Sequence, residues 1–571
     1  MTVHSPLGTA QPRTPEGAPA PSAAAAGPNP AATPRWQMRV AVALVLLHGV
    51  LAWVARAFAV NTHDEANYIL LARALRGFRY VDTFLLGSPP HAHYPPAYPA
   101  FLALLSLPFG EHVGLYIAAN VLASMASLAL LYDVMRRRVG DGPALSALAL
   151  GALNPSVTQF AGMPLSEVPY MFLSVVALWA VLREPAATDE ARSRRWFWPV
   201  LAGGAAIGAA LTRSAGVTIL GALFVYWLFG RYYRRSAVLL AVGTALVGSW
   251  LLWIVLAPHR IVGQSYTSDL TYTPNPQRGL IRALLDRIVD NAASYPTRNL
   301  PSVLPQPAVP GTKIDNLVGI LILLVVAVAG TMVLWKRARI VVVYLAAYAA
   351  LLAIWTWNES RLLIPILPAV LCLIVAGAFR VGAMGRWLRP TPIVIAGIVA
   401  VTAAFQQSSM IRAGLACDRA HATTSPTCFP EQTRGYFAAM RYVRDSLPPD
   451  AVIFTSDDAL TGYYGERPTV FATTFPARDP VAMETGLRAL GVRYMLLSPL
   501  RPPHALHVSQ WLERCADVSL VKEFPATTLL LSLPLAAEPP PAHNACADID
   551  RYSKSAVNAA LWPGPGGVEP P

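Results

Sequence analysis

Apolar segments long enough to cross a membrane recur through the first two thirds of this 571-residue chain, and they limit its possible folds more than any other feature. A membrane-spanning helix needs about 20 predominantly apolar residues. Hydrophobic residues make up 54% of the chain and charged residues make up 13%, whereas charged residues form roughly 25% of soluble domains. The sequence therefore predicts a mainly α-helical fold, a polytopic bundle of transmembrane helices.

Eleven spans are expected from these apolar segments. They are predicted at 38–60, 112–135, 143–160, 165–183, 197–212, 214–230, 236–257, 314–335, 340–356, 360–379 and 390–406. The run 97–109 is apolar too, but counting it as a span would move the arginines at 136–138 to the opposite side. We therefore interpret it as a re-entrant or interfacial helix.

Six basic clusters indicate how the spans are oriented. They lie at 35–39, 136–138, 192–195, 231–235, 336–339 and 380–389. With eleven spans all six fall on one side, which the positive-inside rule identifies as the cytoplasm of a plasma-membrane protein. The N-terminus is then cytoplasmic, and large loops at 61–111 and 258–313 lie outside. The net charge of +13 comes mostly from these clusters, so we expect no nucleic-acid partner.

The chain divides into four predicted regions. They are a disordered cytoplasmic tail (1–34), a transmembrane domain (35–409), a small extracytoplasmic α/β domain (410–540) and an extended or disordered tail (541–571). The first tail has almost no large apolar side chains and cannot bury enough surface to fold. In the α/β domain, helices are expected at 436–447 and 481–490, and strands at 451–454, 492–497 and 527–533.

Four of the five cysteines fall in the predicted outer domain. Cys417, Cys428, Cys515 and Cys546 are even in number, which favours disulfides in an oxidising compartment, and three pairings are possible. A Cys417–Cys428 bridge closes the shortest loop and is expected first, with Cys515–Cys546 as the second. Cys372 lies within a predicted span.

Polar residues gather at the predicted outer ends of the spans, although they come from distant parts of the chain. They are Asp64, Glu65, His91, His93, Tyr94, Glu167, Arg213, Asn358, Glu359 and Arg361. Ionisable residues at a membrane boundary usually face water, a metal or a substrate. Their shared depth predicts an active site on the outer face.

Each of these residues also has a structural interpretation. Thr62 and Glu65 have capping-box spacing at the start of a helix, which is amphipathic and would suit the membrane interface. Glu167 could simply begin a span, and the two histidines could lie in a solvated loop. Arg213 and Arg361 could extend toward the interface, yet they lie on the side that is poor in arginine.

The motifs occur in an order that resembles the polytopic GT-C glycosyltransferases. The branch concerned contains the protein O-mannosyltransferases and the aminoarabinose and lipopolysaccharide-core sugar transferases. The matching motifs are Asp64-Glu65-Ala-Asn-Tyr, Tyr94-Pro-Pro-Ala-Tyr98-Pro, Ser166-Glu167-Val-Pro-Tyr170, Leu211-Thr-Arg213 and the run from Arg361 to Pro368. The resemblance covers residues 38–380.

The resemblance implies an inverting enzyme that moves a sugar from a polyprenyl-phosphate donor to a lipid, glycan or protein acceptor. Asp64 would be the general base, with Glu65 beside it and Glu167 as a further catalytic candidate. A carboxylate can accept the proton that the acceptor hydroxyl loses.

The resemblance also implies groups that bind the donor phosphate. Arg213 and Arg361 can supply positive charge, and His93 takes part in the same site. Several relatives carry a lysine before the Pro-Pro motif, where this chain has His93-Tyr94. A divalent metal held by Glu65 with His91 or His93 is the one cofactor expected.

Two alternatives remain at this stage. A transporter or lipid flippase should carry ionisable residues or helix breaks near the bilayer midplane, whereas the acids of this chain lie at the outer rim. A ligase that transfers a whole lipid-linked glycan could use the same site, since the sequence does not identify the acceptor.

A cysteine or epitope tag at position 90 or 450 is expected to be labelled from outside the cell, and one at 137 or 235 only from the cytoplasm. The reason is the alternation of the basic clusters. Labelling with membrane-impermeant reagents measures this, and cytoplasmic exposure of position 450 would overturn the eleven-span topology.

Overall fold

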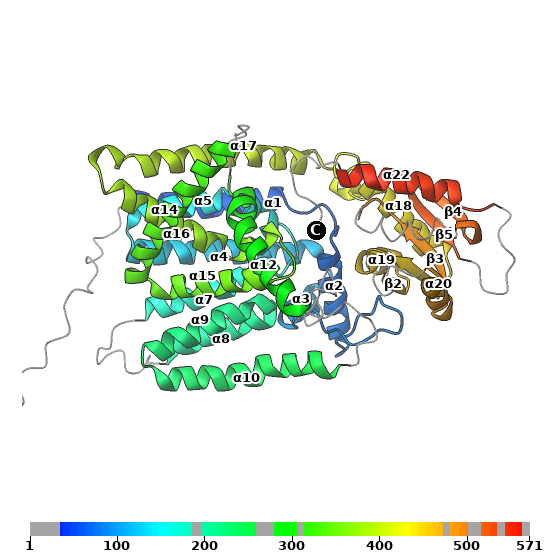
Figure 1. Ribbon diagram of the computed structural model, residues 1–571, viewed down its shortest axis with the longest axis horizontal. Coiled ribbons are helices and arrows are strands. Elements are labelled where there is room, and N and C mark those ends of the chain that lie inside the picture. The colour runs from blue at the N-terminus through cyan, green and yellow to red at the C-terminus, as the bar shows by residue number, and fades with distance from the viewer. Residues whose placement is uncertain are drawn as a thin grey trace, which may run out of the picture.

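The computed structural model describes residues 35–184, 196–257, 279–305, 313–471, 480–500, 515–533 and 543–561. Long helices run side by side in a bundle, and a small α/β domain lies at one end of it (Figure 1). The predicted tail 1–34 and parts of the loop 258–313 lie outside the described residues.

The eleven predicted spans all coincide with helical segments. The bundle consists of α1 (Arg35–Val54), α4 (Val113–Arg138), α5 (Asp141–Ala152), α6 (Pro155–Ala161), α7 (Glu167–Arg183), α8 (Phe197–Thr212), α9 (Val217–Phe229), α10 (Tyr233–Leu256), α14 (Lys313–Arg337), α15 (Arg339–Ile354), α16 (Leu367–Gly382) and α17 (Thr391–Ala416). Among the described residues, six helices are long and apolar enough to cross a membrane, and four apolar helices are shorter. The predicted fold class, a polytopic helix bundle with a small α/β domain, is confirmed.

Two predicted spans are interrupted. The segment 143–160 divides into α5 and α6 because Asn154 caps α6, its side chain accepting a hydrogen bond from Val157 N at 3.0 Å, and Pro155 takes the first helical position. The segment 360–379 begins as a 3₁₀ helix, η6 (Ser360–Ile366), before α16. η6 packs against α7, so it brings Arg361 next to the start of that helix.

The basic ends of several helices contact one another at one end of the bundle. Arg138 donates to the carbonyl of Leu182, and Arg337 donates to the carbonyl of Arg138. Arg235 pairs with Glu184 at 2.7 Å. The α/β domain lies at the opposite end (Figure 1), so the structure separates the basic clusters from the predicted site.

Two short helices lie where the bundle meets the α/β domain. α2 (His63–Arg76) packs between α3 (Ala97–Phe109) and the α/β domain. The sequence predicted an amphipathic α2 that suits the membrane interface, and in the structure Asn67 on its polar side is buried. α3 has 13 residues and is about 20 Å long, too short to cross a hydrocarbon core of about 30 Å.

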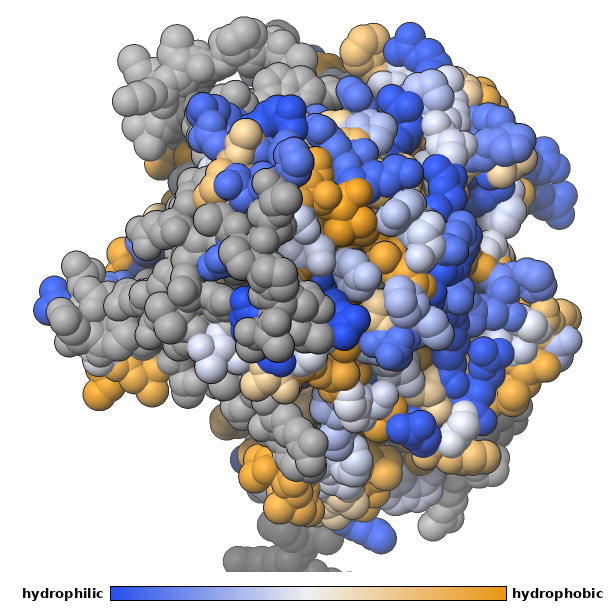
Figure 2. Space-filling model, turned by 90° about the vertical axis from the view of Figure 1, so that its right-hand side faces the viewer, coloured by the Kyte–Doolittle hydropathy of each residue, from blue (hydrophilic) through white to orange (hydrophobic). Residues whose placement is uncertain are grey.

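The C-terminal domain contains a five-stranded mixed sheet with helices on its faces. Its elements are α18 (Glu431–Ser446), β1 (Val452–Thr455), α19 (Asp458–Gly465), β2 (Thr469–Phe471), α20 (Pro480–Ala489), β3 (Val492–Leu497), β4 (Ser519–Phe524), β5 (Thr528–Ser532) and α22 (Cys546–Leu561). The strand order is β2-β1-β3-β5-β4, with β1 parallel to β2 and β3, and β5 antiparallel to β3 and β4. Hydrophilic residues cover much of the end of the molecule that this domain forms (Figure 2).

The predicted extended tail at 541–571 is wrong over residues 546–561, which form α22. Ile549 and Tyr552 on this helix are buried in the core of the C-terminal domain, and Cys546 is bonded to Cys515. The Pro- and Gly-rich composition of the tail concealed a helix that a disulfide and two apolar side chains hold in place. Helix α19 and strands β2 and β4 were not predicted either.

The C-terminal domain is attached to the first loop of the bundle by main-chain hydrogen bonds. Thr469 N, on the edge strand β2, donates to Phe84 O at 2.8 Å, and Leu86 N donates to Thr469 O at 3.0 Å. Tyr464 of α19 donates to Val60 O at 2.7 Å. The unpaired edge of the sheet is therefore used to hold the loop that precedes α3.

Both expected disulfides, Cys417–Cys428 and Cys515–Cys546, are confirmed. The first closes a loop with a sequence separation of 11 where α17 leads into the C-terminal domain. The second joins the segment before β4 to the start of α22.

Replacing Cys417 and Cys428 together with serine is expected to lower the free energy of unfolding of the C-terminal domain by roughly 3 kcal/mol, because the open loop gains freedom in the unfolded state. Thermal unfolding of the purified protein measures this. The control is Cys372→Ala, which changes a free cysteine in the bundle. Equal unfolding temperatures for the double variant and wild type would contradict the stabilising role.

Candidate active site

The centre of the candidate site is an ion pair between two residues far apart in sequence. Asp64, in the first turn of α2, pairs through Oδ2 with Nη2 of Arg361 on η6. The other oxygen of Asp64, Oδ1, accepts a hydrogen bond of 2.6 Å from the hydroxyl of Tyr94. Both carboxylate oxygens are thus held by named partners, and the side chain is only 12% exposed.

Further carboxylates surround the two arginines. Arg361 Nε lies 3.1 Å from Glu359 Oε2 and 3.7 Å from Glu167 Oε1. Arg213, at the end of α8, places Nη1 2.9 Å from the same Glu167 oxygen and 3.1 Å from Ser166 Oγ. Glu167 is fully buried and is shared by both guanidinium groups. The structure therefore brings four predicted site residues, on α2, α7, α8 and η6, into one charged network.

Neighbouring charges decide the protonation state of Asp64. Burial raises the pKa of its carboxyl, but the Arg361 guanidinium, the charge of His63 and the Tyr94 hydroxyl outweigh burial and hold the pKa well below its usual range. Asp64 is therefore ionised when Arg361 is its partner.

Glu65 faces a different environment, although it is the next residue of α2. Its Oε2 accepts hydrogen bonds from Asn61 N at 2.9 Å and Thr62 N at 3.0 Å, and Glu65 N donates to Thr62 Oγ1. This is the capping box that the spacing indicated. Burial raises the pKa of Glu65 to about 7, although the two backbone N–H groups lower it.

The two predicted histidines hold the loop in different ways. His91 Nδ1 lies 2.7 Å from Asp82 Oδ1, and His91 Nε2 accepts a hydrogen bond of 2.7 Å from Tyr94 N. Both of its ring nitrogens are thus engaged, and it orients Tyr94. The ring of His93 meets Tyr94 edge-on at 4.7 Å between centroids. Burial lowers the pKa of His93 to about 3, so His93 is neutral.

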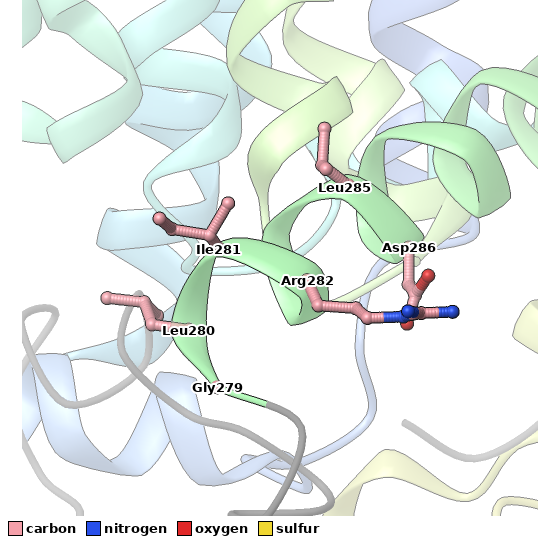
Figure 3. Close-up of a pocket in the computed structure, with 6 residues that line it drawn as sticks. All are labelled: Gly279, Leu280, Ile281, Arg282, Leu285 and Asp286. Carbon is pink, nitrogen blue, oxygen red and sulfur yellow. The ribbon is translucent and has the colours of Figure 1, made fainter.

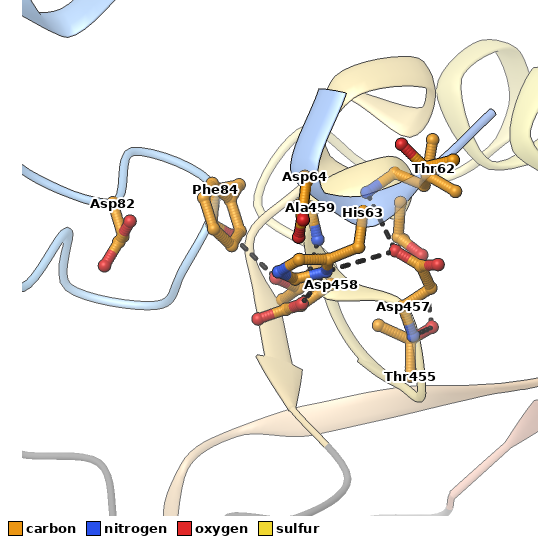
Figure 4. Close-up of polar contacts among 12 residues, drawn as sticks. Thr62, His63, Asp64, Asp82, Phe84, Thr455, Asp457, Asp458 and Ala459 are labelled. Atoms are coloured by element: carbon orange, nitrogen blue, oxygen red, sulfur yellow. Dashed lines mark hydrogen bonds and ion pairs between the residues drawn. The ribbon is translucent and has the colours of Figure 1, made fainter. Parts of the chain in front are cut away.

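A different set of side chains comes within reach of a single ion. Among the described residues, His63, Asp457 and Asp458 place three ligand atoms within 4.8 Å of one another (Figure 4). Glu65, His91 and His93, the predicted metal ligands, do not form such a group there.

Several residues of the site were missed by sequence reasoning. Asp82, Asp457 and Asp458 lie in no recognised motif. Tyr68, one turn after Asp64, hydrogen-bonds Ser166 at 2.7 Å and packs against Tyr94 with 4.7 Å between ring centroids. Tyr94 lies in the Tyr-Pro-Pro motif, so its place in the site could be predicted from the sequence.

An amphipathic helix of the second large loop lies apart from this network. α12 (Leu280–Ser294) is fixed by Asn291, which donates to Leu352 O and Trp355 O at the end of α15. A hollow lies along its first turns (Figure 3). Its lining residues are Gly279, Leu280, Ile281, Arg282, Leu285 and Asp286.

No protein-family model and no curated protein sequence matches this chain. Solved structures do resemble it. ArnT from Cupriavidus metallidurans in the apo state is 15% identical, with a TM-score of 0.52 over 89% of this chain and 99% of that chain. The same protein bound to undecaprenyl phosphate is 16% identical, with a TM-score of 0.50 over 90% and 100%.

The Archaeoglobus fulgidus oligosaccharyltransferase, tethered to an acceptor peptide, also resembles the chain. It is 13% identical, with a TM-score of 0.51 over 84% of this chain and 71% of that chain. The chain therefore has the GT-C fold that its sequence motifs implied.

Proposed function

We propose that this chain, which has the GT-C fold, is an inverting membrane glycosyltransferase that uses a polyprenyl-phosphate sugar as donor. The acceptor is a lipid, a glycan or a protein. The single observation that carries the proposal is the buried Asp64 carboxylate, oriented by Tyr94 and paired with Arg361 at the end of the bundle opposite the basic clusters.

The two arginines are suited to bind the donor phosphate. A guanidinium group can make two parallel hydrogen bonds to phosphate oxygens. Glu167 holds Arg213 and Arg361 close together through one oxygen, so its role is to position them. The neutral His93 can contribute a hydrogen bond beside them. Undecaprenyl phosphate bound to ArnT, a protein of the same fold, supports this class of donor.

The reaction is a single displacement. The acceptor hydroxyl oxygen forms a bond to the anomeric carbon, and the bond from that carbon to the phosphate oxygen breaks. The lipid phosphate leaves with the bonding electron pair and is stabilised by the arginines. The hydroxyl proton passes to Asp64, which acts as general base.

Donor binding would make Asp64 a stronger base. In the structure Arg361 holds the pKa of Asp64 low despite burial, and a carboxylate with a low pKa accepts protons poorly. A donor phosphate competes with Asp64 for the Arg361 guanidinium. Once Arg361 turns to the phosphate, the largest influence that lowers the pKa of Asp64 is lost while burial remains, so the pKa rises even though His63 and Tyr94 still lower it.

Two of the predicted metal ligands, His91 and Glu65, already have other partners. Both ring nitrogens of His91 are engaged by Asp82 and Tyr94, and Glu65 caps α2. The proposed mechanism therefore uses no metal held by Glu65, His91 and His93. In it, Glu65 stabilises the start of α2 and so helps to position Asp64.

A glycan ligase is the second candidate, because an oligosaccharyltransferase resembles the chain nearly as well as ArnT does. Purified enzyme offered polyprenyl carriers bearing one sugar or a preassembled glycan distinguishes the two. Release of the lipid carrier from single-sugar donors supports the transferase, and release only from glycan donors supports the ligase. Release from neither would contradict both.

Arg213→Ala and Arg361→Ala are expected to weaken donor binding by about ten- to a hundredfold each, because a charge-assisted hydrogen bond contributes about 1.5–3 kcal/mol. The Michaelis constant for the donor measures this. Arg76→Ala is the control, since Arg76 lies on α2 but pairs with Glu111, outside the network. Unchanged constants in both variants would show that these arginines serve the fold alone.

Asp64→Asn is expected to reduce turnover by at least about 10²-fold, the lower range for the loss of general base catalysis. Asparagine keeps the shape and can remain in the first turn of α2, but it cannot accept the proton. Turnover is measured with thermal stability in parallel, and Asp445→Asn on the exposed surface of α18 is the matched control. Near-wild-type turnover would leave Asp64 with a structural role and make Glu167 the next candidate.

A further inference from the structure

Three side chains from the two domains converge beside the candidate active site. His63 is the first residue of α2, directly before Asp64, while Asp457 caps α19 and Asp458 begins it. Figure 4 shows His63 lying between the two aspartates. None of the three takes part in the glycosyl transfer proposed above.

The distances within this cluster resemble those between the ligands of one metal ion. His63 Nδ1 lies 3.2 Å from Asp458 Oδ1 and 3.4 Å from Asp457 Oδ1. Tetrahedral zinc binds imidazole nitrogen and carboxylate oxygen at about 2.0–2.1 Å, which places neighbouring ligand atoms about 3.3 Å apart.

Direct histidine–aspartate pairs in the same structure are shorter. His91 and Asp82 lie 2.7 Å apart, and His421 and Asp418 lie 2.9 Å apart, as expected for charge-assisted hydrogen bonds of about 2.7–2.9 Å. At His63 the two distances are longer and nearly equal, so one imidazole nitrogen is shared between two carboxylates, and the three ligand atoms lie within 4.8 Å of one another.

Burial strengthens the case for a cation at this centre. The side chains of Asp457 and Asp458 are 2% and 0% exposed, while that of His63 is 27% exposed. Two adjacent buried carboxylates repel each other and lose hydration, and a divalent cation offsets both costs.

We propose that His63, Asp457 and Asp458 bind a divalent metal ion of the zinc class. One imidazole nitrogen and two carboxylate oxygens form a mixed N/O site with an open position. The ion joins α2 to α19 and so fixes the first turn of α2, in which Asp64 lies. It is separate from the predicted trio of Glu65, His91 and His93.

The experiment is zinc binding to the full-length protein in detergent after removal of metal with a chelator. Isothermal titration with zinc ions and elemental analysis are expected to give one zinc per chain, and zinc should raise the unfolding temperature. His63→Gln and Asp457→Asn are each expected to weaken binding at least about tenfold, since even outer-shell partners contribute about 10- to 100-fold. His421→Gln, which alters an exposed histidine–aspartate pair, is the matched control.

The His63→Cys variant tests whether weaker zinc binding in the other variants comes from loss of folding. Cysteine is also a zinc ligand, so this variant is expected to bind zinc and, with cobalt(II), to show a thiolate-to-metal absorption band that wild type lacks. No zinc bound to wild type, or equal binding by wild type, His63→Gln and Asp457→Asn, would overturn the site. Neither donor nor acceptor is present, so the outcome is independent of the proposed transferase activity.

Discussion

The ion pair between Asp64 and Arg361 is the contact on which the site depends, because it joins α2 to a segment 297 residues later in the chain. Removing two charges from water costs several kcal/mol per ion, and only close pairing with further hydrogen bonds offsets that cost. Tyr94 supplies such a bond to Asp64, and Glu167 and Glu359 lie beside Arg361. α7, the end of α8 and η6 are therefore constrained by the same charges.

The C-terminal domain constrains the opposite side of α2. Thr469 on β2 binds the backbone of the loop that carries Tyr94, and Tyr464 binds the backbone just before α2. His63 meets the start of α19. A general base must be held within a few tenths of an ångström of its productive position, and a helix fixed from both domains provides that. The C-terminal domain therefore helps to position the proposed base, although it carries none of the recognised motifs.

Sequence patterns predicted the features that depend on composition. Apolar runs and alternating arginine clusters located the eleven helical segments, and the shared depth of Asp64, Glu167, Arg213 and Arg361 anticipated their meeting. The pairings themselves could not be predicted, because which carboxylate contacts Arg361 depends on the turn of η6 and the packing against α7. The partners of the histidines could not be predicted for the same reason. His91 contacts Asp82, and His63 contacts aspartates of another domain. Only the tertiary fold creates those contacts.

The contacts of Asp64 favour its position but oppose its basicity, and this conflict bears on the proposed mechanism. A carboxylate held by a guanidinium and a tyrosine hydroxyl is well positioned but weakly basic. The same pairing satisfies two charges that would otherwise be costly to bury. A phosphate group can replace Asp64 as the partner of Arg361 without leaving that arginine unpaired. In the proposed mechanism Asp64 then gains basicity when a donor is present, which couples proton transfer to donor binding.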